Sequence, residues 1–569
     1  MNLLNFSKAN CKNCYKCLRT CQVKAVKIQN DQAGIVEDRC IGCGQCLVIC
    51  PQDARNIKSD LEDVKSAIKQ NKRVIASIAP SFAGAFDLKA EGSLVSALKV
   101  LGFNIVEETA VGAEVVAQLY DKAIKSHKEK NLFTTCCPSA NYLIDTYYPS
   151  LTKYLIPVVS PMLAHGKMLK QSYGYDSYVV FIGPCTAKKI EAVSFQHEGT
   201  IDAVLTFEEL TKWILEEELD MNTLQPQEFD AAVGMNGQAY PLIGGVLDSF
   251  DNSPSYEKLR VHGIAECMEA LKSIEEGSLE GVCVEFNVCA GGCINGPGMP
   301  KSEKDFYKRQ KRVKKYISEK SKCISKPRSM PTGLDFSKVF IPRPLEKHLA
   351  SDYELKEILE GMGKHEAADE LNCGGCGYNT CREKAQAVYE GMAEMSMCLP
   401  FMRGKAENIT NVIYENTPNI IMFIDDKLNV TEMNPIAQNI FGVKEDFIKN
   451  RPISIIMDEE PFRTVRDSKK SLLAQRVSYP NYGVVLLENI LYLKKENVIL
   501  AIMSNITNEE KQRDELKRVK ENAIDAAERV IEKQMRVAQE IASLLGETTA
   551  ETKITLTKLK KIALQETGE

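Results

Sequence analysis

The chain has 569 residues, of which 44% are hydrophobic and 26% are charged. At roughly 100–200 residues per domain, this length implies about three to five domains able to bury real cores. The net charge of −5 excludes a protein that binds nucleic acid through bulk positive charge, and no apolar run approaches the roughly 20 residues that span a membrane.

The 20 cysteines are the unusual feature of the composition, and all of them lie between residues 11 and 398. The first residues lack the basic and apolar regions of a signal peptide, which predicts a cytoplasmic protein in a reducing compartment. There, clustered cysteines are more typical of metal sites than of disulfides. The cysteines therefore divide the chain into a metal-rich part and a metal-poor part.

The first two cysteine runs, residues 11–21 and 40–51, both have the spacing C-x2-C-x2-C-x3-C. Runs of this spacing hold [4Fe–4S] clusters, and in two-cluster ferredoxins the fourth cysteine of each run ligates the other cluster. The segment resembles bacterial ferredoxins, with a zinc site as the alternative, and we predict a two-cluster domain over residues 1–62. The expected ligand sets are Cys11, Cys14, Cys17 and Cys50 for one cluster, and Cys21, Cys40, Cys43 and Cys46 for the other.

From about residue 70 the pattern changes to α/β. The expected strands are Val74–Ala79, Leu132–Thr135, Tyr178–Ile182 and Val282–Phe286. Each runs into a loop that contains Pro, Gly or Cys. In open α/β sheets, ligands bind beyond the carboxyl ends of the strands, so these loops are where a cofactor is expected.

Three of these loops carry recognisable motifs: Thr134–Pro138 reads TTCCP, Gly183–Glu191 reads GPCTAKKIE, and Glu285–Gly298 reads EFNVCAGGCINGPG. In this order they resemble the three signature motifs of [FeFe] hydrogenases. The resemblance implies an H-cluster domain over residues 63–345. Its [4Fe–4S] part would be held by Cys137, Cys185, Cys289 and Cys293.

The same resemblance implies a diiron subsite with CO, cyanide and azadithiolate, bridged by Cys293. Lys188 would donate to one cyanide, the Ala79, Pro80 and Ser81 stretch would line the other, and Cys136 would relay protons. The alternatives are a buried structural thiol for Cys136 and a surface salt bridge for Lys188.

The motifs also depart from the family. Gly183 and Asn287 replace methionines, the paired glutamates of the proton path align with Leu119 and Tyr120, and the relay serine aligns with Ile156. A proton path needs titratable or hydroxyl groups at hydrogen-bond spacing, and apolar replacements break it. We therefore expect a slow hydrogenase, or one that mainly binds H2.

Residues 301–328 hold 12 Lys or Arg against three acids. This predicts a solvated helix, with docking of an acidic electron donor as the alternative. Beyond it, Cys373, Cys376, Cys381 and Cys398 have the spacing C-x2-C-x4-C-x16-C. They resemble a small [4Fe–4S] domain of corrinoid and electron-bifurcating proteins, expected over 346–407, with a helix at Arg382–Met397 and zinc as the alternative. We expect this cluster to lie between the hydrogenase domain and the segment that begins at residue 408.

Three cysteines, Cys267, Cys283 and Cys323, remain outside these sets and are expected to be structural or free.

Residues 408–508 resemble a PAS domain. The expected strands are Ile421–Ile424, Val484–Leu487, Ile490–Leu493 and Val498–Ser504, with a short helix over 434–442. The segment contains no His or Cys, which argues against a ligated haem or a cysteinyl-flavin photosensor. Residues 509–569 are charged with apolar residues at 3/4 spacing, which predicts a coiled coil or a single amphipathic helix.

The predicted fold class is therefore multidomain α+β and α/β: a two-cluster ferredoxin domain, an H-cluster domain, a small [4Fe–4S] domain, a PAS domain and a C-terminal helix. The expected function is a slow [FeFe] hydrogenase that senses H2 or redox state. Its expected partners are a redox carrier such as ferredoxin, a kinase or phosphatase in trans, and a second copy of the chain. The alternatives are an electron-transferring hydrogenase and an iron–sulfur scaffold protein without a diiron site.

Overall fold

The computed structural model describes residues 4–6, 10–90, 92–126, 129–231, 237–250, 256–302, 305–320, 330–346, 348–545, 554–555 and 557–558. The unassigned Cys323 lies outside these ranges. The chain divides into two compact units, Met1–Met402 and Arg403–Glu569. Within the described ranges, no helix combines the length and the apolar character needed to cross a lipid bilayer.

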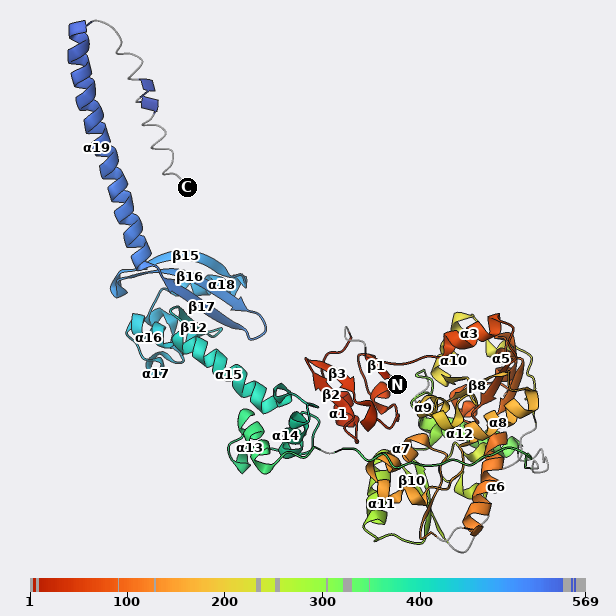
Figure 1. Ribbon diagram of the computed structural model, residues 1–569. Helices are drawn as coiled ribbons and strands as arrows, with labels where there is room; N and C mark the ends of the chain where they lie inside the picture. Colours follow the sequence, from red (N-terminus) through yellow and green to blue (C-terminus); the bar gives the residue numbers. More distant parts are fainter. Residues whose placement is uncertain are drawn as a thin grey trace. The chain divides into compact units, whose positions relative to one another are not determined.

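The first two cysteine runs fold into two similar halves, drawn in red in Figure 1. Strand β1 (Leu4–Phe6) pairs antiparallel with β4 (Arg55–Ile57), and β2 (Val26–Gln29) with β3 (Gln32–Ile35). A short helix begins inside each run, α1 (Lys16–Thr20) and α2 (Gln45–Val48). The residue before each helix, Tyr15 or Gly44, has a positive φ, so both runs make the same sharp turn.

Four parallel strands form the first sheet of the next region, in the order β6 (Ile105–Glu108), β5 (Val74–Ile78), β8 (Tyr178–Gly183), β9 (Ala203–Thr206). Every residue of β5 is buried, which is expected where helices cover both faces of a parallel sheet. The helices of this part are α3 (Leu61–Lys69), α4 (Phe82–Ala85), α5 (Gly92–Val100), α6 (Ala110–Ser126), α8 (Pro161–Tyr173), α9 (Ala187–Ala192) and α10 (Phe207–Glu216).

A second, three-stranded parallel sheet has the order β10 (Glu257–His262), β11 (Val282–Asn287), β7 (Leu132–Phe133). Helices α7 (Pro138–Tyr147) and α11 (Ile264–Glu275) belong to this part. Both sheets are parallel, so the cysteine loops that follow β7, β8 and β11 all leave from carboxyl ends of strands. The four strands expected from the sequence are present, with β7 ending two residues early.

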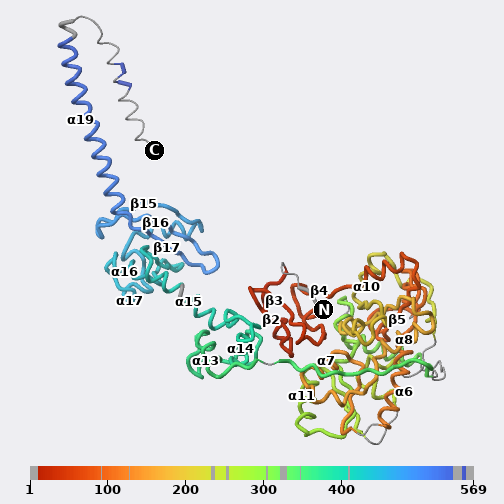
Figure 2. The backbone as a smooth tube through the Cα atoms, viewed as in Figure 1, coloured from red at the N-terminus to blue at the C-terminus, as the bar shows by residue number. Residues whose placement is uncertain are grey.

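The basic segment after residue 301 forms α12 (Phe306–Lys320), which is less solvated than expected. Its Arg309, Val313 and Tyr316 are buried, and the helix packs against α4. Lys308, Lys311, Lys314 and Lys315 are exposed, whereas Arg309 lies on the packed face. After α12, the extended segment 330–346, green in Figure 2, crosses the same region. Backbone hydrogen bonds join the two: Lys338 and Arg343 of the segment donate to Pro157 and Asp145, and Val159 donates to Phe336 of the segment.

The third cysteine region contains α13 (Asp352–Gly361) and α14 (Cys381–Tyr389), with short 3-10 turns at Ala367–Asp369 and Met395–Met397. The expected helix over Arg382–Met397 is wrong in its length, because the chain turns at Gly391, where φ is +68°. This region packs against the first two cysteine runs rather than against the two parallel sheets: Leu18 and Ile28 share one core with Tyr378 and Met397. Its expected position between the parallel-sheet region and the segment from residue 408 stays a prediction.

The second unit contains a six-stranded antiparallel sheet. Its order is β14 (Arg451–Pro452), β13 (Asn429–Met433), β12 (Ile420–Ile424), β17 (Val498–Asn505), β16 (Val484–Leu493), β15 (Leu472–Tyr479). Two strands expected separately form the single strand β16, and β15 was not expected. The helices are α16 (Pro435–Phe441), α17 (Glu445–Ile448) and α18 (Glu460–Ser468), followed by α19 (Thr507–Leu545). Helix α15 (Leu399–Asn416) contains the division between the units.

Candidate functional site

A cavity of about 90 Å³ opens where the loops after β5, β7, β8 and β11 meet. It is lined by most of the residues that the hydrogenase motifs single out: Ala79, Pro80, Ser81, Cys136, Cys137, Cys185, Lys188 and Cys293. Cys289 does not line the cavity, but burial and then the nearby charges of Cys185, Cys137 and Cys293 raise its pKa, so it lies close to them. The fold therefore brings together residues that are far apart in the sequence.

The four cysteines of this set, Cys137, Cys185, Cys289 and Cys293, suit a positively charged iron core. Burial, and then the charge of Cys137, raises the pKa of Cys185 to about 11. Thiolates that are buried together oppose one another's ionisation, so the set is stable as four ligands only around a cation. Gly292, with φ of +84°, has no room for a side chain, because a Cβ would lie 2.7 Å from the Pro241 carbonyl oxygen.

A polar atom without a partner also faces this cavity. Ser81 is 1% exposed, lines the cavity, and its Oγ has no hydrogen-bond partner in the described part of the chain. A buried hydroxyl without a partner is costly and indicates an absent ligand. The residues present therefore fit a polar group bound in the cavity.

Lys188 lies in the wall of the cavity as a buried ion pair. Its Nζ is 2.7 Å from Glu191 Oε2 and donates to the Cys136 carbonyl at 3.3 Å. Burial opposes ionisation of both partners, but their mutual attraction raises the pKa of Lys188, and Glu191 with Lys188 and Lys338 beside it has a pKa lowered to about 2. An ammonium has three donors, so one remains for a ligand.

Cys136 contacts a hydroxyl that the sequence prediction overlooked. Tyr120 is fully buried on α6, and its Oη lies 3.4 Å from Cys136 Sγ and 3.0 Å from Thr135 Oγ1. Thr135 Oγ1 donates to the Val158 carbonyl, where the chain of hydroxyls ends. The expectation that position 120 is an apolar break is wrong, whereas Ile156 is buried and apolar as expected.

The two departures in the second and third motifs change the cavity wall. A Cβ on Gly183 would lie 2.7 Å from the Phe181 ring, which fills that space. Asn287 lines the cavity and donates to Glu285 Oε1 at 2.7 Å. Glu285 in turn accepts from the backbone N–H groups of Gly244, Val246 and Leu247, and Val246 lines the same cavity.

The ferredoxin-like segment has two further sets of cysteines. One cavity is lined by Cys11, Cys14, Cys17 and Cys50, the predicted first set. In the second set, burial and then the charges of Cys21, Cys46 and Cys40 raise the pKa of Cys43, so these four thiols lie close together. Each set mixes the two runs, as the crossed assignment requires.

The loop around Cys43 packs directly against the motif loops. Thr186 Oγ1 donates to the Gly42 carbonyl at 2.7 Å, and a Cβ on Gly44 would lie 2.7 Å from both Pro297 and Thr186. The charge of Cys43 also raises the pKa of Cys289, after burial and the charges of its three partner cysteines. Cys43 and Cys289 therefore mark the close approach between the ferredoxin-like segment and the central set.

The third region has a cavity lined by Cys373, Cys376, Cys381 and Cys398. The fold therefore brings together the four cysteines that the sequence assigned to one site.

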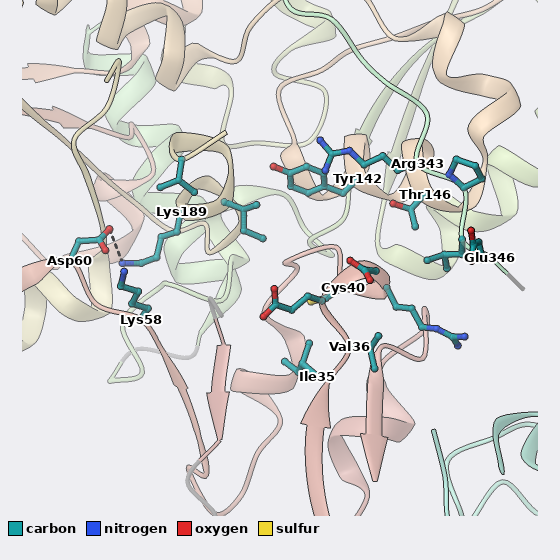
Figure 3. A pocket seen from close by; sticks show the side chains of 17 residues that line it. Ile35, Val36, Cys40, Lys58, Asp60, Tyr142, Thr146, Lys189, Arg343 and Glu346 are labelled. Carbon is teal, nitrogen blue, oxygen red and sulfur yellow. Dashed lines mark ion pairs between the residues drawn. The ribbon is translucent and has the colours of Figure 1, made fainter. Parts of the chain in front are cut away.

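A larger cavity, about 850 Å³, was not expected from the sequence and is shown in Figure 3. It lies between the ferredoxin-like segment, α7, α9 and residues 343–346, and it reaches Cys40. Lys189 and Asp60, 3.6 Å apart, form an ion pair on its wall. Acidic and basic side chains both line it, so its charge does not select one kind of ligand.

Comparison with known families fits this geometry. Residues 72–297 match the family described as "Iron only hydrogenase large subunit, C-terminal domain". This part of the chain is therefore similar to iron-only hydrogenases. Residues 3–69 match a 4Fe-4S dicluster domain, and residues 369–400 match an Fe-S cluster family. Iron–sulfur clusters are thus the cofactors of the first unit.

Curated relatives are similar to part of this chain. Iron hydrogenase 1 of Clostridium pasteurianum is 27% identical over 52% of this chain and 65% of its own length. The NADP-reducing hydrogenase subunit HndD of Solidesulfovibrio fructosivorans is 24% identical over 56% of this chain and 65% of its own. The chain thus spans 65% of the length of each of these two relatives.

Among solved structures, a variant of [FeFe]-hydrogenase HydA1 from Chlamydomonas reinhardtii has a TM-score of 0.41 and 18% identity, covering 51% of this chain and all of that one.

Proposed function

We propose that this chain is an [FeFe] hydrogenase of low turnover that senses H2 or redox state and signals to a partner. The observation that carries the proposal is the central cavity, which Cys136, Lys188 and Ser81 line together with Cys137, Cys185 and Cys293. When bound, a diiron subsite with CO, cyanide and azadithiolate would supply the chemistry that converts H2 to protons and electrons.

The residues around the cavity have separable roles. The free donor of Lys188 and the unpartnered Ser81 hydroxyl, which line the same cavity, would each bind an anionic cyanide. The Cys136 thiol, at the same cavity, would accept or donate the proton. The matched set Cys137, Cys185, Cys289 and Cys293 would hold the adjoining cluster.

Low turnover follows from the short hydrogen-bonded path that leads away from Cys136. The path has two buried hydroxyl groups, those of Tyr120 and Thr135, and it ends at the Val158 carbonyl, which is not a titratable group. Burial raises the pKa of Tyr120 well above its usual value, so this hydroxyl resists ionisation. Because Leu119 and Ile156 offer no hydroxyl or carboxyl, proton transfer through this route would limit the rate.

The remaining parts suit a signalling role. The close approach of Cys43 to Cys289 would carry electrons to the ferredoxin-type clusters. We infer that the antiparallel sheet over 420–505 belongs to a PAS domain, because its first hairpin, short helix and closing strands follow the predicted order. Helix α19, with exposed Leu516, Val519, Val530 and Val537, would pair with a second copy and act on a kinase or phosphatase.

The test is the infrared spectrum of the anaerobically matured full chain under argon and then under H2. Metal-bound CO and cyanide absorb where protein does not. We expect bands that shift with H2, and faster hydrogen exchange in β17 or α19 under H2. Bands that do not shift contradict the H2 sensor, and an absence of bands after verified maturation favours the iron–sulfur scaffold.

The second candidate is an electron-transferring hydrogenase whose tail only dimerises it. It is favoured by the exposed basic face of α12, with Lys308, Lys311, Lys314 and Lys315, which suits an acidic carrier such as ferredoxin. Turnover with reduced ferredoxin at rates typical of catalytic hydrogenases would support this candidate and contradict the sensor.

A further inference from the structure

Hydrogen bonds join the third cysteine region to the ferredoxin-like segment, and they lie in the loops that contain the cysteines. Arg19 Nη1 donates to the Gly375 carbonyl at 3.1 Å, and Lys24 Nζ donates to the Gly377 carbonyl at 2.7 Å. A Cβ on Gly377 would lie 2.9 Å from the Leu18 side chain, so no side chain fits between the two loops. The loop of Cys376 therefore rests on the helix between Cys17 and Cys21.

The groups between Cys21 and Cys376 indicate a short route for an electron. Tyr378 is 4% exposed and packs with Leu18, in one core with Cys21 and Cys376. Burial lowers the pKa of Lys24, and the charges of Cys21, Glu383 and Cys376 oppose this shift. One ammonium thus lies within the fields of thiols from both regions.

Lys384 is the unusual charge in the third region. Its side chain is 2% exposed, lines the cavity of Cys373, Cys376, Cys381 and Cys398, and bonds only neutral groups, the Glu394 carbonyl and Met397 Sδ. In the described residues Lys384 forms no ion pair with a carboxylate. Burial lowers its pKa to about 8, and the charges of Cys376, Cys398 and Glu394 oppose this shift. Lys364 lines the same cavity, but the Asp369 carboxylate is close enough to feel its charge.

A buried ammonium without a carboxylate needs another anion. The anion that this cavity can offer is a cluster held by four thiolates, whose net charge is −2 when oxidised and −3 when reduced. A nearby positive charge stabilises the reduced form more than the oxidised form, and so raises the reduction potential.

In the ferredoxin-like segment, the two cysteine sets share one buried arginine. Burial raises the pKa of Cys40 and Cys46, and the charge of Arg55, which also lines the cavity of Cys11, opposes this rise. Lys24 adds a positive charge beside Cys21, but the same charge acts on Cys376. The charge of Cys17 raises the pKa of Cys46, so the two sets also repel one another's electrons.

We propose that Lys384 raises the reduction potential of the cluster at Cys373, Cys376, Cys381 and Cys398 above those of both ferredoxin-type clusters, so that this site stores the electron. The inference rests on the proposed function and adds to it the destination of the electrons. The step is a one-electron transfer without proton or bond change: the cluster at Cys21 is oxidised from 1+ to 2+, and the cluster at Cys376 is reduced from 2+ to 1+.

The test is an EPR-monitored redox titration of the full chain with reconstituted iron–sulfur clusters and no maturation of the diiron subsite. The signal of the third region is assigned by its loss in a Cys373→Ala, Cys376→Ala double variant. In the unsubstituted chain, the EPR signal of the third region should appear before those of the ferredoxin-type clusters as the potential is lowered. In Lys384→Met the equilibrium constant for its reduction should fall at least tenfold, a shift of about 59 mV to lower potential.

Lys356→Met is the matched control, the same substitution on an exposed lysine of the same region, and it should leave the potential unchanged. Iron content and far-UV circular dichroism verify that each variant is folded and loaded. If Lys384→Met does not fold, the order of potentials in the unsubstituted chain still decides, and a third-region potential at or below the others overturns the proposal. A shift below twofold in a folded Lys384→Met variant overturns it as well.

This experiment uses no H2 and no diiron subsite, so its failure is distinct from failure of the proposed function. Responsive infrared bands together with the wrong order of potentials would retain the hydrogenase and reject only the electron store.

Discussion

Glu191 in the first unit and Glu488 in the second are both buried, with 0% and 1% exposure, yet their surroundings favour opposite charge states. Glu191 lies between Lys188 and Lys338, whose charges overcome burial and lower its pKa to about 2. Glu488 has the Tyr479 hydroxyl at 2.6 Å as its partner, and burial raises its pKa. The first environment favours a charged carboxylate beside a cavity, and the second favours a neutral carboxyl group inside a core.

The largest effect is expected from loss of a predicted metal ligand in the first unit, and it should leave the second unit unchanged. Cys185→Ala removes one of four ligands of the central set, so we expect complete loss of the CO and cyanide bands in the infrared spectrum. Cys283→Ala is the matched control, because Cys283 is 2% exposed and belongs to no ligand set. The hydrogen exchange of β12 and β17, in the second unit, should not change. Bands retained in Cys185→Ala would contradict the assigned ligand set.

The second-largest effect is expected at the buried ion pair. Glu191→Gln leaves the ammonium groups of Lys188 and Lys338 without their partner, and breaking a buried pair costs about 3–5 kcal/mol. The loss of unfolding free energy is measured by denaturant unfolding of the apo chain, with hydrogen exchange of β8 as the probe. Lys315→Met, at an exposed pair with Glu319, should change the unfolding free energy by less than about 1 kcal/mol.

The same pair predicts a pH dependence. The folded pKa of Glu191, about 2, is below its ordinary value of 4.5, so its stabilisation is present above pH 4.5 and is lost as the pH falls toward 2. A shift of this size corresponds to about 3 kcal/mol. The acid loss of stability in β8 should therefore be smaller in Glu191→Gln, and an unchanged acid limb would contradict the assigned charge state.

A smaller effect is expected at Tyr120. Tyr120→Phe removes the acceptor of the buried Thr135 N–H, which lies 2.7 Å from the hydroxyl, and an unsatisfied buried donor costs about 1–3 kcal/mol. Tyr154→Phe, outside the cavity lining, serves as the control in the same unfolding measurement. If the Tyr120 hydroxyl also relays protons, the rate at which the matured variant exchanges H2 with deuterium should fall. An unchanged exchange rate would show that Tyr120 is not part of the proton path.

The sequence predicted features set by local spacing. The cysteine sets follow from short, repeated intervals, and β5, β8 and β11 follow from apolar runs that end in motif loops. The contact between Tyr120 and Cys136 joins α6 to the loop after β7, and no local pattern indicates it. Strand β15 was missed because most of its residues are exposed on both faces, so it lacks the alternation that marks a half-buried strand. The docking of Tyr378 on Leu18 is likewise a contact between distant segments.

The smallest effect is expected at Glu488, and its sign sharpens the comparison. A carboxyl with a raised folded pKa stabilises the fold below its unfolded pKa, and this contribution is lost as the pH rises through the folded pKa. Glu488→Gln keeps the acceptor for Tyr479 and cannot ionise, so near pH 5 we expect a change below about 1 kcal/mol. As the pH rises, hydrogen exchange of β16 should accelerate in the unsubstituted chain and stay level in Glu488→Gln. Tyr479→Phe, which removes the partner but keeps the carboxyl, should enlarge the acceleration. If β16 instead becomes more stable with rising pH, Glu488 is ionised like Glu191, and the two regions do not differ in how they treat buried charge.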